Sequence, residues 1–162
     1  MKCTECGAAM KTRNRKHHRY DECGLQHVTL VGVGVSHCPR CGNEEVSIPR
    51  IEVLHRLIAR TLIQKPTRLT GDEVRFLRKS LGWSGADFAK HMGVAHETVS
   101  RWENDAAPIG PQADRLLRLM VAQGCLTTRY PTDRLTQIDA RKATITRLEL
   151  ESRGEHWELR SA

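Results

Sequence analysis

Four of the six cysteines in this 162-residue chain occur as two pairs with the same spacing. Cys3 and Cys6 belong to one C-x-x-C-G unit, and Cys38 and Cys41 belong to the other. Two residues between thiolates allow a tight turn to direct both sulfurs at one ion, and the glycine that follows can adopt the positive φ that completes the turn. Two such turns supply the closed tetrahedral shell of a structural zinc site.

Other interpretations of these cysteines are weaker. A redox dithiol of the thioredoxin type requires a βαβ setting, which this sequence lacks. Unligated core thiols would not explain the doublets, and four thiolates leave no open position for the water of a catalytic zinc. We therefore expect one structural Zn²⁺ per chain. Its role would be to supply folding free energy to a segment of about 45 residues that has few large apolar side chains.

The remaining cysteines and the nearby histidines have less specific patterns. Cys23 and Cys125 are expected to be buried or idle thiols. Four histidines in the same segment are alternative metal ligands, although surface or strand positions suit them better: His17, His18, His27 and His37.

A second motif lies between Ser84 and Asn104. Ala89, Gly93 and Val99 stand at the offsets of a helix-turn-helix, which needs a small residue for close helix approach, a glycine in the turn and an apolar residue facing inward. Ser84 is a suitable N-cap for the first of the two helices. Other apolar residues at helical spacing are expected to complete the core: Val74, Leu77, Leu81, Phe88, Met92, Val94, Leu116, Leu117, Met120 and Val121.

The helix that follows Gly93 is polar on one side and suits a reader of the DNA major groove. The residues expected on or beside that face are His96, Glu97, Ser100 and Arg101. Arginine can bond bidentately to guanine, and a glutamate can accept from cytosine. Ser84 with the amides of its helix, and Asn104, are expected to hold phosphates.

Two observations qualify this interpretation of the polar helix. Glu103 is expected to pair with Arg75 or Arg78 and is therefore not counted as a DNA contact. The competing interpretation is a solvated face in an ordinary four-helix domain, and the near-zero charge of residues 66–123 favours it. The spacing of the small, glycine and apolar residues outweighs that argument.

The rest of the chain sets the expected architecture, an α+β and mainly α fold. Valine-rich residues 28–35 predict one or two strands interrupted by Gly32 and Gly34, and residues 51–64 predict a connecting helix that ends before Pro66. In the tail, residues 131–142 suggest a short helix, and residues 144–151 and 155–160 a hairpin with Leu148, Leu150, Trp157 and Leu159 on one face. The expected domains are 1–48 (zinc module), 49–66 (connecting helix), 67–123 (helix-turn-helix) and 124–162 (extension, a dimerisation or hairpin element).

Compartment and enzyme class follow from what the sequence lacks. The N-terminus has no hydrophobic signal region, and the longest apolar stretch, 28–35, is too short to cross a bilayer. We therefore expect a cytoplasmic protein with reduced thiols and no membrane partner. The sequence contains no H-E-x-x-H, P-loop or G-x-S-x-G signature, so we expect no enzymatic activity.

The segment 69–120, with S-R-W-E-N-D after the turn, resembles XRE/Cro-type domains. Together with Cys3, Cys6, Cys38 and Cys41, the chain resembles the MqsA-type (YgiT-type) zinc-finger/helix-turn-helix antitoxins over about residues 1–123. The resemblance implies a homodimer that represses its own operon. It also implies a zinc module that binds and neutralises a toxin, often an RNase.

Two departures from the family pattern are relevant. Glu97 stands where an amide side chain is more typical, which implies a different operator, and residues 124–162 extend beyond short members. The alternative function is a stand-alone zinc-ribbon/XRE regulator with no toxin partner.

The net charge of +7 favours an anionic partner, and most of the excess lies in residues 1–65. A run of basic residues there has no acid between its members: Lys11, Arg13, Arg15, Lys16 and Arg19. One hypothesis makes this run a nucleic-acid reader, with Tyr20 available for stacking. A mobile basic loop, or a contact with an acidic toxin surface, is the favoured interpretation.

Overall fold

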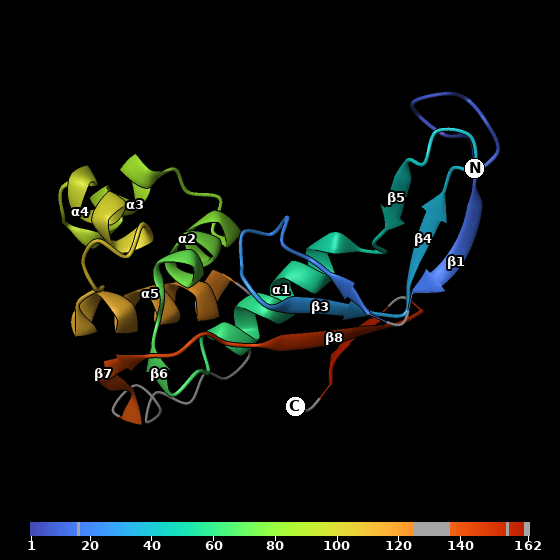
Figure 1. The fold of residues 1–162 in the computed structure, drawn as a ribbon. Coiled ribbons are helices and arrows are strands. Elements are labelled where there is room, and N and C mark those ends of the chain that lie inside the picture. The colour runs from blue at the N-terminus through green and yellow to red at the C-terminus, as the bar shows by residue number, and fades with distance from the viewer. Residues whose placement is uncertain (16, 125–136, 155, 161–162) are drawn as a thin grey trace. The chain divides into compact units, whose positions relative to one another are not determined.

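A computed structural model describes residues 1–15, 17–124, 137–154 and 156–160 of the chain. It confirms the expected α+β fold (Figure 1). The elements in chain order are β1 (Lys11–Arg15), β2 (His18–Arg19), β3 (Val28–Val31), β4 (Val33–His37), β5 (Glu44–Ser47), α1 (Ile51–Leu62), β6 (Thr67–Arg68), α2 (Gly71–Ser80), α3 (Gly85–Met92), α4 (His96–Glu103), α5 (Pro111–Gly124), β7 (Asp139–Ala143), β8 (Leu148–Arg153) and β9 (His156–Leu159).

The chain divides into two compact units. The cysteine unit comprises residues 1–20, 28–54 and 148–162, and the helical unit comprises residues 21–27 and 55–147. The cysteine unit contains a three-stranded sheet of order β1-β4-β5 and a four-stranded sheet of order β2-β3-β8-β9. The helical unit contains α2 to α5 and the β6-β7 pair. The domain boundaries at residues 48, 66 and 123 stay predictions.

The three-stranded sheet includes most of the basic run. β1 is an edge strand that pairs antiparallel with β4, and Lys11 lies opposite His37. The Oγ atoms of Thr12 and Ser36 are 2.8 Å apart across the pair. The expectation of a mobile loop is therefore wrong over Lys11–Arg15. An edge strand accommodates these charges because one of its sides remains open to solvent.

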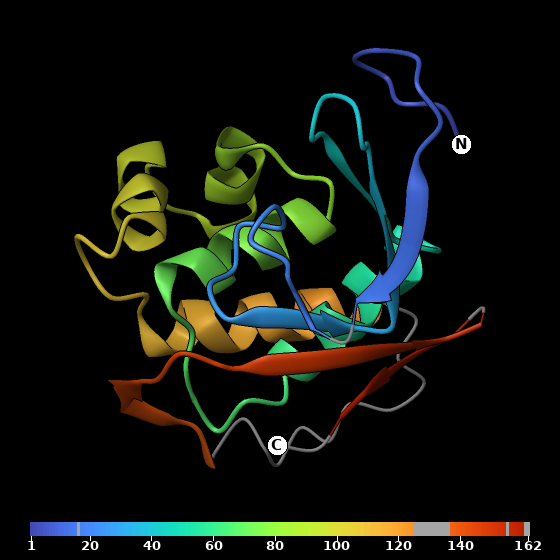
Figure 2. The same ribbon diagram turned by 45° about the vertical axis from the view of Figure 1, so that its right-hand side comes forward.

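The four-stranded sheet joins distant parts of the sequence. β3 runs parallel to β8, so that Val28 lies opposite Leu148 and Leu30 opposite Leu150, and all four side chains are buried. Figures 1 and 2 both show these strands side by side. Residues 28–37 thus form two strands, as expected, although Gly34 lies within β4 and does not interrupt it.

The predicted C-terminal hairpin is confirmed as β8 and β9. Its register puts Leu148, Leu150, Trp157 and Leu159 on one face, and the first three are buried, whereas Leu159 is 43% exposed. The indole Nε1 of Trp157 donates to the carbonyl oxygen of Pro49 at 2.8 Å. This bond satisfies the polar atom of a buried tryptophan.

The helical unit confirms most of the predicted helices. The connecting helix is α1, and α2 to α5 are separated around Gly82, Gly93 and residues 104–110; the break at Gly93 is the predicted turn. Thr70 and Ser84 begin α2 and α3 with capping boxes, so the predicted N-cap at Ser84 is correct. Leu117 and Val121 are fully buried, but Leu116 is 39% exposed, contrary to its predicted core position.

A buried ion pair links α5 to the segment that precedes α2. Arg118 is fully buried, and its Nε donates to Asp114 Oδ1 at 2.5 Å. Its terminal nitrogens donate to the carbonyl oxygens of Lys65 (2.5 Å) and Thr67 (2.7 Å). Asp114 Oδ2 in turn accepts from the amide of Leu69 at 2.9 Å. The charges are tolerated in the interior because each is paired and hydrogen-bonded.

A second buried pair holds the tail segment that follows β7. Lys65 Nζ donates to Glu73 Oε2 at 2.6 Å and to the carbonyl oxygen of Thr144 at 2.5 Å. The hydroxyl of Thr146 donates to the other oxygen of Glu73 at 2.8 Å. The carboxylate of Glu73 therefore completes the capping box of α2 and also binds the tail.

The helix predicted over residues 131–142 is wrong where the structure describes it. Residues 131–136 lie outside the described residues, whereas Asp139–Ala143 form β7, which runs parallel to β6. Pairing with β6 gives these backbone groups partners outside their own segment, which single-sequence periodicity does not reveal.

Gly71 provides a test of close packing in the helical unit. A Cβ atom there would lie 2.6 Å from the carbonyl oxygen of Trp102 and 2.8 Å from that of Glu103. We predict that Gly71→Ala lowers the free energy of unfolding by about 2 kcal/mol, against the gain that alanine normally brings to a helix. Urea denaturation measures this value. Gly110→Ala, whose Cβ would meet nothing within 4 Å, is the matched control, and equal stability of the two variants would contradict the packing argument.

Candidate functional site

The four paired cysteines come together in the cysteine unit. The ligand atoms of Cys3, Cys6, Cys38 and Cys41 all lie within 4.8 Å of one another. The Sγ atoms of Cys3 and Cys41 are 3.6 Å apart, and those of Cys6 and Cys38 are 3.5 Å apart. A tetrahedral zinc with Zn–S bonds of about 2.3 Å needs sulfurs about 3.8 Å apart. The cluster therefore fits a four-thiolate metal ion, and the sulfurs are far too distant for disulfides.

Two equivalent turns build the cluster. The amide of Gly7 donates to the carbonyl oxygen of Cys3 at 2.9 Å, and the amide of Gly42 donates to that of Cys38 at 3.0 Å. Both glycines have the positive φ that the sequence predicted, +71° and +77°. A glycine adopts this conformation without the steric penalty of other residues. The repeated C-x-x-C-G motif thus specifies each half of the site locally.

The thiols of the cluster differ in pKa. A hydrogen bond with the backbone of Ala8 lowers the pKa of the Cys6 thiol to about 6, with further lowering from Cys38 and Arg40. The backbone of Asn43 lowers the pKa of Cys41, but hydrogen bonds with Cys38 and Cys6 outweigh it and raise that pKa to about 12. A bound zinc ion takes its cysteine ligands as thiolates, so metal binding would release the protons of all four thiols.

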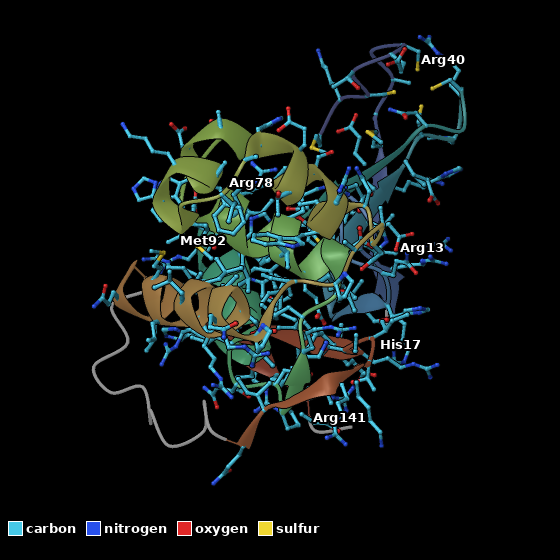
Figure 3. All side chains as sticks on the ribbon, turned by 90° about the vertical axis from the view of Figure 1, so that its left-hand side faces the viewer. Arg13, His17, Arg40, Arg78, Met92 and Arg141 are labelled. Atoms are coloured by element: carbon cyan, nitrogen blue, oxygen red, sulfur yellow. The ribbon has the colours of Figure 1, made fainter. Side chains whose placement is uncertain are left out.

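Polar side chains around the cysteines were not singled out by the sequence analysis. The guanidinium of Arg40 donates to the carbonyl oxygen of Cys6, and Asn43 Nδ2 lies 3.7 Å from Cys3 Sγ. The hydroxyl of Thr4 donates to Glu45 Oε1 at 2.9 Å. Figure 3 shows sulfur atoms gathered near Arg40. Four thiolates around a divalent ion leave a net negative charge, which the positive charge of Arg40 partly neutralises.

The other candidate ligands do not join the cluster. Among the described residues, the group that could hold a metal consists of the four cysteines alone, without His17, His18, His27 or His37. Cys23 lies apart from it in the helical unit, where burial raises the pKa of its thiol. Cys125 lies outside the described residues.

We predict that Cys38→Ser abolishes binding of one metal equivalent, because it removes a fully buried ligand from the closed shell. Metal content by inductively coupled plasma mass spectrometry measures the stoichiometry. Cys23→Ser removes a thiol outside the cluster and should keep the full equivalent. Equal metal content in the two variants would mean that the four sulfurs do not form the site.

The helical unit presents a second candidate site. α3 ends at Gly93, whose φ of +66° and ψ of +33° are left-handed, as the sequence predicted. The amide of Val94 donates to the carbonyl oxygen of Ala89 at 3.0 Å, and α4 begins at His96 after the N-cap Ala95. Ala89 and Val99 are buried at the junction, also as predicted. This geometry is that of a helix-turn-helix.

The outer face of α4 is open to solvent. His96, Glu97, Ser100 and Arg101 are all exposed, whereas Val99 and Trp102 on the opposite side are buried. The edge of Trp102 packs against Phe88 of α3, with ring centroids 6.4 Å apart. The short helix is thus held on one side by the core and exposes on the other the four side chains that the sequence assigned to base recognition.

Glu103 holds the end of α4 against α2. Its carboxylate accepts from Arg78 Nε at 2.5 Å and from Arg75 Nε at 3.4 Å, which confirms the predicted intramolecular pair. Arg78 also donates to the carbonyl oxygen of Trp83 at 2.7 Å. An ion-pair network therefore fixes the orientation of α4, and His96, Glu97, Ser100 and Arg101 are not part of it.

The expected phosphate contacts have partners within the chain. Ser84 donates its hydroxyl hydrogen to Asp87 Oδ2 at 2.6 Å, and this bond lowers the pKa of Asp87. The side-chain oxygen of Asn104 accepts from Arg75 at 2.8 Å. Neither residue loses its exposure, so their contacts with phosphate stay predictions.

His96 has a defined position that the sequence did not predict. A Cβ atom on Gly85 would lie 2.9 Å from His96 Nε2, so the imidazole lies directly over the first turn of α3. A further ring contact orders this region, since the ring centroids of Trp83 and His91 are 4.0 Å apart in a stacked arrangement. Such contacts depend on the three-dimensional packing of α3 and α4.

A comparison with protein-family models matches the helix-turn-helix family over residues 74–124. Residues 74–124 form an XRE-type helix-turn-helix domain. No curated protein and no solved structure matches the chain. This domain supports the function of a DNA-binding transcriptional regulator. Within the described residues, no helix is both long and apolar enough to span a membrane.

Proposed function

We propose that this regulator is a sequence-specific repressor and the antitoxin of a type II toxin–antitoxin pair that represses its own operon. The observation that supports repression is the exposed outer face of α4, held rigidly on its inner side. A recognition helix needs both properties, because base contacts require groove access and a fixed orientation. The cytoplasm is the compartment that this proposal requires.

Each side chain of the α4 face has a proposed role. Arg101 donates two hydrogen bonds to one guanine, and Glu97 accepts from a cytosine amino group. His96 and Ser100 contact the neighbouring bases or sugars. Ser84 and Asn104 flank this face and contact phosphates, together with the backbone amides that begin α3.

The proposed operator-binding species is a homodimer. A single α4 reads only a few base pairs, and helix-turn-helix proteins extend the site by placing two recognition helices one helical turn apart. The exposed side chain of Leu116 on α5 would be covered in such a pair, which gives a reason for its position outside the core.

The antitoxin role is supported by the combination of two units in one chain. A four-thiolate cluster with a closed shell has no catalytic position, so a structural Zn²⁺ that stabilises a binding module is its best use. We propose that this module binds the toxin while α4 binds the operator. A stand-alone regulator is the alternative, in which the cysteine unit has another ligand.

Arg101→Ala tests the repressor proposal. We expect about a five- to 150-fold loss of operator affinity, since a bidentate arginine–guanine pair contributes about 1–3 kcal/mol. Fluorescence anisotropy with the promoter fragment of the protein's own operon measures the dissociation constant. Arg141→Ala removes an equally exposed charge from β7 and should change affinity less than twofold. Similar losses in both variants would point to non-specific attraction and argue against base reading.

Co-expression with the adjacent gene tests the antitoxin proposal. We expect the neighbouring gene product to co-purify with the wild-type chain and with Arg101→Ala, and to arrest growth when expressed alone. Cys38→Ser should lose the partner, whereas Cys23→Ser should retain it. If the wild-type chain binds its operator but neither captures nor neutralises the neighbour, the stand-alone regulator replaces the antitoxin.

A further inference from the structure

A cavity of about 500 Å³ lies on the three-stranded sheet of the cysteine unit. Its lining comes from all three strands: Lys11, Arg13 and Asn14 of β1, Val35 and His37 of β4, and Glu44 of β5. The size falls in the range of small-molecule sites. The DNA-binding and metal-binding residues described above contribute nothing to this cavity.

The strand register explains why five of these residues converge on one face: Lys11, Arg13, Val35, His37 and Glu44. Lys11, His37 and Glu44 form one row across the sheet, because Lys11 lies opposite His37 and His37 opposite Glu44. Arg13 and Val35 are paired in the next row on the same face. Directly opposed side chains have Cβ atoms about 5 Å apart. The cations of β1 thus project beside His37 over a buried apolar floor, Val35.

The charges of this cavity are unbalanced. None of the ion pairs found among the described residues involves Lys11, Arg13 or His37, and Lys11, Arg13 and His37 are exposed. Glu44 is the one carboxylate in the lining. Two permanent cations and an imidazole against one carboxylate favour an anionic ligand.

The donor set fits a phosphate better than a carboxylate. Arginine binds phosphate oxygens through two parallel bonds, lysine adds a point charge, and an imidazole adds a third donor. The cavity is larger than a phosphate group, so it also has space for the body of the ligand. Val35 offers that body an apolar surface, while Glu44 lies in the row of Lys11 and His37 and can accept from its amino or hydroxyl groups.

We propose that this cavity binds a phosphate-bearing nucleotide, with the phosphate held by Lys11, Arg13 and His37. The phosphate belongs either to a free nucleotide, which would make the cysteine unit the sensor of a small effector, or to a nucleic-acid strand. This proposal does not depend on the operator or toxin proposals, because the cavity shares no residue with the α4 face or with the four-cysteine cluster. It gives Lys11 and Arg13 of the basic run a specific function.

Isothermal titration calorimetry of the full-length metal-loaded chain with AMP and with inorganic phosphate tests the site. We expect saturable binding of both probes and at least a tenfold loss in the double variant Lys11→Ala/Arg13→Ala. Arg141→Ala/Lys142→Ala removes two exposed cations from β7 and should change affinity less than twofold. Metal content of each variant verifies that the cysteine unit is folded.

Glu44→Gln is expected to raise the affinity for phosphate, which is the opposite of the effect expected for Lys11→Ala/Arg13→Ala. Removal of the carboxylate should make inorganic phosphate bind about two- to fivefold more tightly, because a like charge no longer faces the anion. Absence of saturable binding of either probe up to 10 mM, about the limit of weak specific sites, would overturn the proposal. Equal losses in the two double variants would also overturn it, because net charge alone would then explain binding.

Titrations with a non-operator duplex and with a single-stranded oligonucleotide distinguish the two sources of phosphate. A Lys11→Ala/Arg13→Ala defect confined to AMP and phosphate supports a free nucleotide. A defect that extends to the oligonucleotides, with a reduced slope of affinity against salt, supports a strand. Operator binding by Arg101→Ala is measured separately, so failure of the repressor proposal leaves this test intact.

Discussion

The position of α4 in the helical unit depends on the carboxylate of Glu103. It accepts hydrogen bonds from two arginines of α2, and one of these, Arg78, also binds the carbonyl oxygen of Trp83 just before α3. One acidic side chain thus fixes the positions of α2, α3 and α4. Glu103 and Arg78 are both largely buried, so solvent screens their ion pair less than it screens a surface pair, whereas the Arg75 side chain is 33% exposed. The exposed face of α4 keeps its orientation through this network.

The cysteine unit is held together by local turns and by strand pairing. Its turns each aim two sulfurs at one point, and this geometry is specified within a few residues of each pair. The β-sheets around them join residues far apart in sequence, above all β3 and β8. A metal ion would add its binding free energy to an arrangement whose backbone pairing closes a long loop, which is costly in chain entropy.

Local signals in the sequence account for much of the structure. The C-x-x-C-G turns, the cap at Ser84 and the turn at Gly93 all rest on residues whose conformational preference is strong at short range. The hairpin around Gly154 belongs to the same class. Each of these features needs only its own neighbours, or the facing turn of a helix, in order to form.

The features that the sequence analysis missed require long-range pairing. Lys11–Arg15 lacks the alternation of a half-buried strand because both its faces carry polar residues, yet it pairs with β4 along its whole length. β7 forms only because β6 lies beside it, and Leu116 is exposed although its spacing matches the core stripe. The cavity over Val35 likewise combines strands whose order no periodicity reveals.

The bonds between the tail and α2 affect how the DNA-binding part can be isolated. Glu73 and Lys65 are buried together, and their partners in the tail are Thr146 and the carbonyl oxygen of Thr144. A shortened chain that stops after α5 would leave a carboxylate and an ammonium group at the base of α2 without those partners and open to water. A fragment that keeps these bonds therefore extends at least through Thr146, although the matched family model ends at residue 124.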